Sequence, residues 1–120
     1  MNIEKIIHNN KTIAVITSDG KVLTNVQSAL DLIMTAKYEV GTNLIAIDKN
    51  AVAEDFFILS RGLAGEILEK FITYQAKIAI WGDYSKYTSK PPKDFIYESN
   101  KGKDVFFVAT KDESIEYLSR

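Results

Sequence analysis

The 120-residue sequence contains no cysteine, only one histidine and only two prolines. Without cysteine the chain can form no disulfide, perform no thiol chemistry and build no zinc finger of the usual ligand type. The sequence also lacks an excess of either charge, because 15 Lys and Arg are balanced by 16 Asp and Glu, for a net charge of −1. We therefore expect no nucleic-acid partner, since no overall positive field attracts a polyanion.

Long apolar runs are missing as well. No segment approaches the ~20 apolar residues that a membrane span needs, and the opening stretch MNIEKIIHNN lacks the apolar core of a signal peptide. The sequence therefore predicts a cytoplasmic protein without a membrane partner. It contains neither a P-loop nor a G-x-G-x-x-G motif, and we expect no cofactor and no bound metal.

The apolar residues that are present follow the pattern of an α/β protein. Asn9 and Asn10 separate two short apolar runs and predict a β-hairpin of residues 3–8 and 11–17. Apolar residues at helical spacing predict a helix over 25–38, with Thr24 or Asn25 as its N-cap. His8, the only histidine, falls beside the hairpin turn with no nucleophile nearby, and we interpret it as a solvated turn residue.

Three further apolar stretches, NLIAID, KIAIWGD and DVFFVAT, predict buried strands. Helices are expected between them and after the last, with Ser89 capping the third helix and Thr110 the fourth. The order β-β-α-β-α-β-α-β-α implies mainly parallel pairing. We predict one domain over residues 1–120, an α/β fold with a mixed, mainly parallel sheet, an N-terminal hairpin and about four helices.

The stretch EDFFILSRGLAGEIL, residues 54–68, has two interpretations. One continuous helix over 54–74 would carry Leu59, Leu63, Ile67 and Phe71 as an apolar row. Alternatively the helix begins at Ser60, which then caps it, and leaves free backbone N–H groups at its start. The second interpretation makes the segment a candidate binding site.

Ligands of open α/β sheets bind outside the carboxyl ends of the parallel strands. Two predicted strands end there at Asp48 and just before Asp83, and the start of the second helix reaches the same rim. An aspartate at a strand end is also a common turn residue, and Arg61 can simply pair with Asp55 or Asp83. The candidate ligand- or partner-binding residues are Asp48, Ser60, Arg61, Gly62, Asp83, Tyr84 and Ser85; no residue is assigned a catalytic role.

The motif LSRGLAGEIL, following a strand that ends in AID, resembles the signature of STAS domains, the sulfate transporter and anti-sigma-factor antagonist family. Ser60, Gly62 and Leu63 match the first serine, the glycine and the leucine of that signature. Arg61 stands where the family carries its phosphorylated serine, which argues against phosphorylation-controlled partner switching. The blocks DFFILSRGLAGEILEKFITY, AIWGDYS and FIYESNKGKDVFFV also resemble a bacterial domain-of-unknown-function family grouped with STAS-like folds.

The resemblance implies a STAS-like fold and supplies no activity. It favours a regulatory or protein-interaction module without catalysis, whose partner is another protein. Two alternatives stay open from the residues: a protein that binds a small molecule or anion at the same rim, and an enzyme that uses Asp48, Arg61 and Asp83. The sequence leaves the oligomeric state undetermined.

Overall fold

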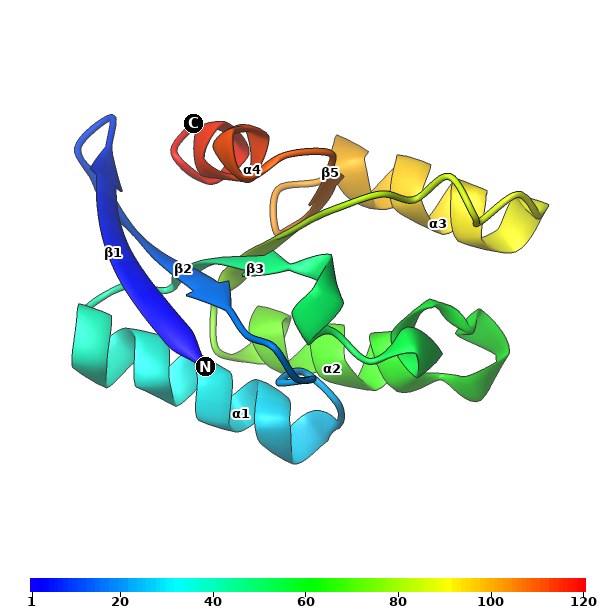
Figure 1. The fold of residues 1–120 in the computed structure, drawn as a ribbon, viewed down its shortest axis with the longest axis horizontal. Coiled ribbons are helices and arrows are strands. Elements are labelled where there is room, and N and C mark those ends of the chain that lie inside the picture. The colour runs from blue at the N-terminus through cyan, green and yellow to red at the C-terminus, as the bar shows by residue number, and fades with distance from the viewer.

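The computed structural model describes all residues from 1 to 120, and its five strands form one sheet in which spatial order follows sequence order (Figure 1). The first two strands pair antiparallel and every later pair is parallel, which confirms the predicted mixed α/β sheet. The strands are β1 (Asn2–His8), β2 (Lys11–Thr17), β3 (Leu44–Asp48), β4 (Lys77–Trp81) and β5 (Val105–Val108).

Four α-helices and several short turns of helix connect or follow the strands. None of the helices is both long enough and apolar enough to cross a membrane. The α-helices are α1 (Val26–Thr35), α2 (Leu63–Thr73), α3 (Lys90–Lys101) and α4 (Lys111–Leu118). The short turns are η1 (Ala36–Val40), η2 (Lys49–Ala51), η3 (Glu54–Phe57) and η4 (Leu59–Arg61).

The hairpin between β1 and β2 forms where the two asparagines predict it. Asn9 and Asn10 have φ angles of 52° and 65°, and two consecutive positive φ values fit the tight turn that matches the twist of paired strands. Asparagine tolerates this region better than other residues with a side chain.

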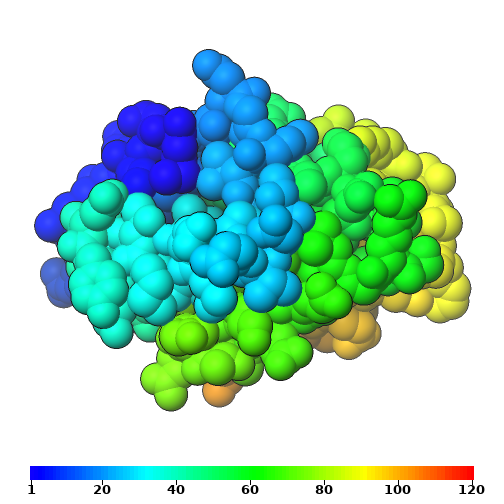
Figure 2. Space-filling view, turned by 90° about the horizontal axis from the view of Figure 1, so that it is seen from below, coloured from blue at the N-terminus to red at the C-terminus, as the bar shows by residue number.

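The sheet is covered on both faces, but unequally. Alternate residues of each strand point to opposite faces, so Ala14 and Ile16 join a large core cluster with α1 and α2, while Ile13 and Val15 join a smaller one with α4. Figure 1 shows α4 on one side of the sheet and α1 and α2 together on the other. Seen from below, α1 in cyan and the green segment that leads into α2 form one continuous surface (Figure 2).

Helix α1 begins as predicted and ends differently. Asn25 is its N-cap, accepting a hydrogen bond from the backbone N–H of Ser28 at 2.8 Å, and the Ser28 side chain bonds back to the Asn25 N–H. The last turn widens into the π-type turn η1, and Gly41 follows it at φ 81°. The predicted helix over 25–38 is therefore an α-helix extended by a wider turn.

Helix α3 closes the β5 side of the sheet. The side-chain amide of Asn100 donates to the Phe107 carbonyl at 3.0 Å and accepts from the Phe107 N–H at 2.7 Å. One side chain thus satisfies two groups of a strand whose outer edge has no further strand. Ser89 precedes the helix as predicted, but its side chain makes no capping hydrogen bond.

Candidate functional site

The carboxyl ends of β3 and β4 lie next to each other, because Asp48 is paired with Trp81 in the parallel register. The connections that follow both strands extend to the same end of the sheet, which we call the carboxyl edge (Figure 1). Three of the predicted site residues, Asp48, Asp83 and Ser85, consequently line one cavity. This part of the predicted rim is brought together by the topology of the sheet.

The segment from Glu54 to Gly62 is neither a continuous helix nor a helix that begins at Ser60. It consists of two 3₁₀ turns, η3 and η4, and α2 begins at Leu63. Both interpretations of the sequence are therefore wrong in detail. A continuous right-handed helix cannot pass through Gly62, whose φ is 76°. The burial of Phe56 and Phe57, which are 0% and 5% exposed, holds the preceding turns against the core.

Gly62 explains why Ser60 does not cap α2. Gly62 occupies the N-cap position with φ 76°, a left-handed conformation that glycine adopts without steric cost, and no side chain caps the helix. Ser60, Arg61 and Gly62 are all exposed. The segment is an open turn on the surface, held from below by the buried Phe pair.

Arg61 lies outside the cavity that Asp48 and Asp83 share. Its guanidinium Nη1 lies 3.1 Å from the Asp55 carboxylate, and the two side chains are 61% and 51% exposed. Of the two simple ion pairs that the sequence allows, the structure contains the one with Asp55. Exposed pairs of this kind contribute little to stability.

The cavity at the carboxyl edge is polar and has a volume of about 310 Å³. We call it the Lys49 cavity, after one of the two lysines that line it. It is formed by the residues after β3 and by the loop after β4. Its lining residues are Asp48, Lys49, Asn50, Glu54, Gly82, Asp83, Ser85 and Lys86.

Lys49 places its ammonium group among three aromatic rings. The Nζ atom lies 5.2 Å from the ring centre of Phe57, 5.1 Å from that of Tyr87 and 5.9 Å from that of Tyr84. Cations are attracted to the faces of aromatic rings at such distances. The rings also pack on one another, with Phe57 and Tyr87 stacked at 4.9 Å.

Burial and neighbouring charges tune the ionisable groups of the cavity in opposite directions. Desolvation lowers the pKa of Lys49, and the carboxylate of Glu54 partly offsets this effect. The pKa of Glu54 is itself lowered, mainly by a 2.7 Å hydrogen bond from Lys86, whose pKa is raised by the same bond. Lys49 is thus the one cation of the cavity that its surroundings make easier to deprotonate.

The predicted residues of the β4 loop have structural bonds of their own. The Asp83 carboxylate accepts the Ser85 N–H at 2.8 Å, which lowers the pKa of Asp83. The Tyr84 hydroxyl donates to the Ile80 carbonyl at 2.6 Å, and burial raises the pKa of Tyr84. Asp48 likewise accepts the Asn50 N–H, at 2.9 Å. These contacts shape the loops around the cavity, as turn aspartates commonly do.

His8 is not the solvated turn residue that its sequence position indicates. Its Nδ1 lies 2.9 Å from the Oγ of Ser119, a residue only 3% exposed, which also contacts the Asn9 side chain at 3.4 Å. A histidine and a serine are therefore in contact across 111 positions of sequence. The serine hydroxyl is enclosed, and the contact joins the hairpin to the end of α4.

Among the residues that shape this site, sequence reasoning missed Lys49, Glu54, Lys86 and the ring of Tyr87. Lys49 had a usable signal, because it directly follows the strand-end residue Asp48. The other three become relevant only when the loops after β3 and β4 meet. No three His, Asp or Glu side chains gather in an arrangement that could hold a metal ion.

Residues 8–118 match the family described as Domain of unknown function (DUF4180). The chain belongs to this family. The match spans both loops of the Lys49 cavity and includes His8, while Ser119 lies one residue beyond the matched range. Searches of the curated proteins and of the solved structures find no match. The family description supplies no activity, so a functional interpretation depends on the geometry.

Proposed function

We propose that the chain is a cytoplasmic regulatory or protein-interaction module with a STAS-like fold, and that it contacts a partner protein through the turns at residues 54–62. The observation that carries the proposal is the exposure of Ile58. This side chain is 41% exposed although it directly follows two buried phenylalanines. A large apolar side chain presented by an anchored turn can form the apolar centre of a protein interface.

The surroundings of Ile58 support a protein partner. Leu59 is half-buried beside it, and the Asp55–Arg61 ion pair lies on the same pair of turns. Protein interfaces commonly combine an apolar centre with a charged rim, and arginine is enriched in them. The buried Phe56 and Phe57 hold the turns in place, which reduces the entropy lost on binding.

The position of Arg61 favours binding over catalysis at this edge. An enzyme using Asp48, Arg61 and Asp83 would need the three side chains around one reacting atom. Arg61 instead pairs with Asp55, and its side chain is 61% exposed. The guanidinium is therefore available to a partner carboxylate, for which it has the right bidentate geometry.

A photo-crosslinking amino acid at position 58 tests the proposal in cells. We expect a discrete crosslinked product, identified by mass spectrometry, that the substitution Arg61→Glu abolishes. The same crosslinker at Gln27, an exposed residue of α1, should not give it. Lys111→Glu is the matched control for Arg61→Glu, because Lys111 also forms an exposed ion pair at 3.1 Å, with Glu4. This substitution should leave the crosslinked product unchanged. Equal crosslinking from positions 58 and 27 would contradict the proposal.

A second candidate function is the binding of a small polar molecule in the Lys49 cavity. The observation in its favour is that groups of both charges line about 310 Å³ of space, with Lys49 partly desolvated. Small-ligand sites combine such a volume with a few convergent polar groups. A thermal-shift screen of amino acids and small dicarboxylates should then give a stabilising compound whose effect is lost in Lys49→Met and kept in Lys5→Met.

A further inference from the structure

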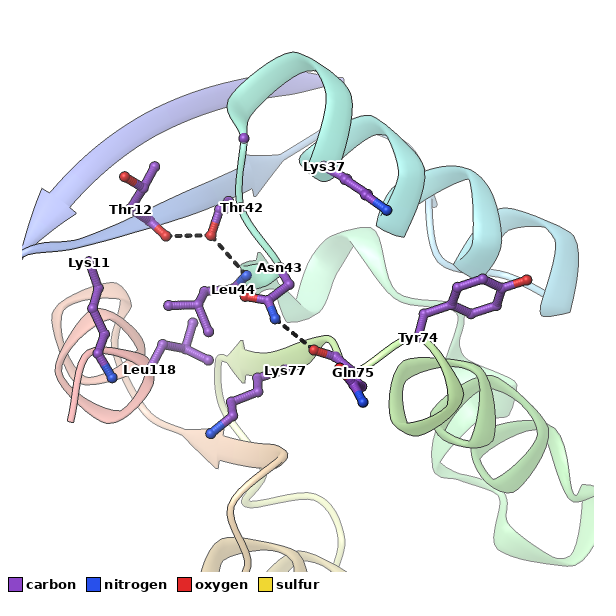
Figure 3. Close-up of a pocket in the computed structure, with 11 residues that line it drawn as sticks. Lys11, Thr12, Lys37, Thr42, Asn43, Leu44, Tyr74, Gln75, Lys77 and Leu118 are labelled. Carbon is purple, nitrogen blue, oxygen red and sulfur yellow. Dashed lines mark hydrogen bonds between the residues drawn. The ribbon is translucent and has the colours of Figure 1, made fainter.

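A larger cavity lies at the opposite end of the sheet, where the parallel strands begin. It has a volume of about 710 Å³ and is formed by the starts of β2, β3 and β4 and by the ends of η1 and α2 (Figure 3). We call it the amino-edge cavity. Its volume falls within the range of known small-ligand sites.

The charge of this cavity is of one sign. Lys11, Lys37 and Lys77 line it, and no Asp or Glu side chain does, although the whole chain carries a net charge of −1. In Figure 3, Lys11 and Lys77 extend to the same side of the opening and Lys37 extends from η1 on the other side. The cavity therefore presents three cations without a lining anion, which favours an anionic ligand.

The ammonium groups are not occupied by carboxylate side chains. The Lys77 ammonium makes no hydrogen bond or ion pair, and the Lys11 ammonium donates only to the Arg120 main-chain oxygen, at 2.8 Å. Lysines near helix ends often serve only to balance the helix dipole. Lys37 lies in η1, and Lys11 donates to a main-chain oxygen just beyond the end of α4, so that explanation leaves Lys77 alone without an account.

Gln75 adopts an unusual backbone conformation at the same place. It follows α2 with φ 56°, one of only three residues other than glycine with a positive φ. Glycine is the usual residue at this position after a helix, because a side chain is unfavourable there. The Gln75 side chain lines the amino-edge cavity, while the Gln75 carbonyl accepts a hydrogen bond from the Asn43 side-chain amide at 2.7 Å.

We propose that the amino-edge cavity binds a small anion that carries at least two phosphate groups. Lys11 and Lys77 contact its phosphate oxygens, Lys37 adds positive charge from across the opening, and the Gln75 amide donates a further hydrogen bond. Lysine binds phosphate as a mobile point charge, which suits an open cavity. This site is separate from the turns at 54–62, and the proposal does not depend on the protein-interaction function.

Isothermal titration calorimetry with inorganic pyrophosphate tests the site. We expect saturable binding with one site per chain, weakened by added salt because exposed charges are screened. Lys77→Gln should raise the dissociation constant about tenfold or more, as expected for the loss of a charge-assisted hydrogen bond. Lys5→Gln makes the same charge change at an exposed residue of β1 outside the cavity, and should have no comparable effect.

Two further variants locate the site and separate binding from folding. Gln75→Gly should weaken pyrophosphate binding while raising the thermal unfolding midpoint, a combination that a damaged fold cannot produce. Lys86→Gln removes a cation of the Lys49 cavity and should leave binding unchanged. The proposal is overturned if pyrophosphate does not bind saturably, if Lys5→Gln and Lys77→Gln weaken it equally, or if Lys86→Gln abolishes it.

Discussion

Gly82 and Lys49 approach each other so closely that a side chain on Gly82 would collide with Lys49. A Cβ atom built on Gly82 would lie 2.6 Å from the Lys49 Cβ and 3.1 Å from its Cδ. The first of these atoms belongs to the base of the side chain, which cannot move without the backbone. The absence of a side chain at Gly82 therefore allows Lys49 to lie among Phe57, Tyr84 and Tyr87.

The substitution Gly82→Ala should destabilise the domain by about 1–3 kcal/mol, the usual cost of forcing an extra carbon into a packed site. Chemical denaturation measures the change in the free energy of unfolding. Gly20→Ala is the matched control, because nothing lies within 4 Å of a Cβ atom at that position. Equal effects of the two substitutions would show that the Gly82–Lys49 approach is not a constraint.

The lowered pKa of Lys49 predicts a dependence of stability on alkaline pH. Since desolvation lowers its pKa below the ordinary value of 10.5, the unfolded chain binds more protons at this residue than the folded one. Stability then rises with pH between the folded and the unfolded pKa. We expect the wild type to gain stability relative to Lys49→Met as pH increases from 7 toward 10, measured as the difference between their unfolding midpoints. Parallel curves would contradict the prediction.

Phe57 and Ile58 are adjacent in sequence, but we expect the Phe57 side chain to contribute far more to stability than the Ile58 side chain. Phe57 is 5% exposed and its ring contacts those of Phe56, Tyr84, Tyr87 and Phe107, whereas Ile58 is 41% exposed. Phe57→Ala should cost about 3–5 kcal/mol, as for other buried aromatics. Ile58→Ala should change stability by less than about 0.5–1 kcal/mol. Urea denaturation of both variants tests whether the turns are anchored by Phe57.

The contact between His8 and Ser119 should be worth about 1 kcal/mol, the net contribution of a typical hydrogen bond. A double-mutant cycle with His8→Ala and Ser119→Ala measures it directly through the coupling energy. Hydrogen exchange should also become faster at Lys11, whose N–H belongs to the hairpin end of β2. If the two substitutions are simply additive, the contact contributes nothing.

Much of the fold could be predicted because its signals are local. The Asn9–Asn10 pair specifies its own turn, and the capping box at Asn25 and Ser28 lies within four residues. The buried strands stand out as short apolar runs, since both of their faces are covered. Such features depend on neighbouring residues alone, so a single sequence is sufficient to reveal them.

The start of α2 could not be predicted in the same way. Leu59 and Leu63 fit the apolar row of a helix that continues to Phe71, and Ser60 is a good capping residue by type. The residue at which α2 begins depends on the aromatic rings that Phe56 and Phe57 contact, namely those of Tyr84, Tyr87 and Phe107. Those partners lie in other segments, and helical spacing contains no information about them.

The candidate site was predictable only in part, for the same reason. The carboxyl edge follows from the order of strands, so Asp48 and Asp83 could be placed together. Lys49 gains its character from desolvation and from three rings that belong to two separate connections. A charged residue acquires such properties from its tertiary neighbours, and its sequence context does not record them.

The agreement between spatial and sequence order of the strands has a consequence for synthesis on the ribosome. Each strand from β2 onward pairs with the one made just before it, so the sheet can grow as the chain emerges, N-terminus first. The segment of α4 then contacts the first hairpin, where the Ser119 side chain bonds to His8 and the Lys111 ammonium bonds to Glu4. We therefore expect the sheet to assemble strand by strand during translation and to be closed once residues 111–119 have left the exit tunnel.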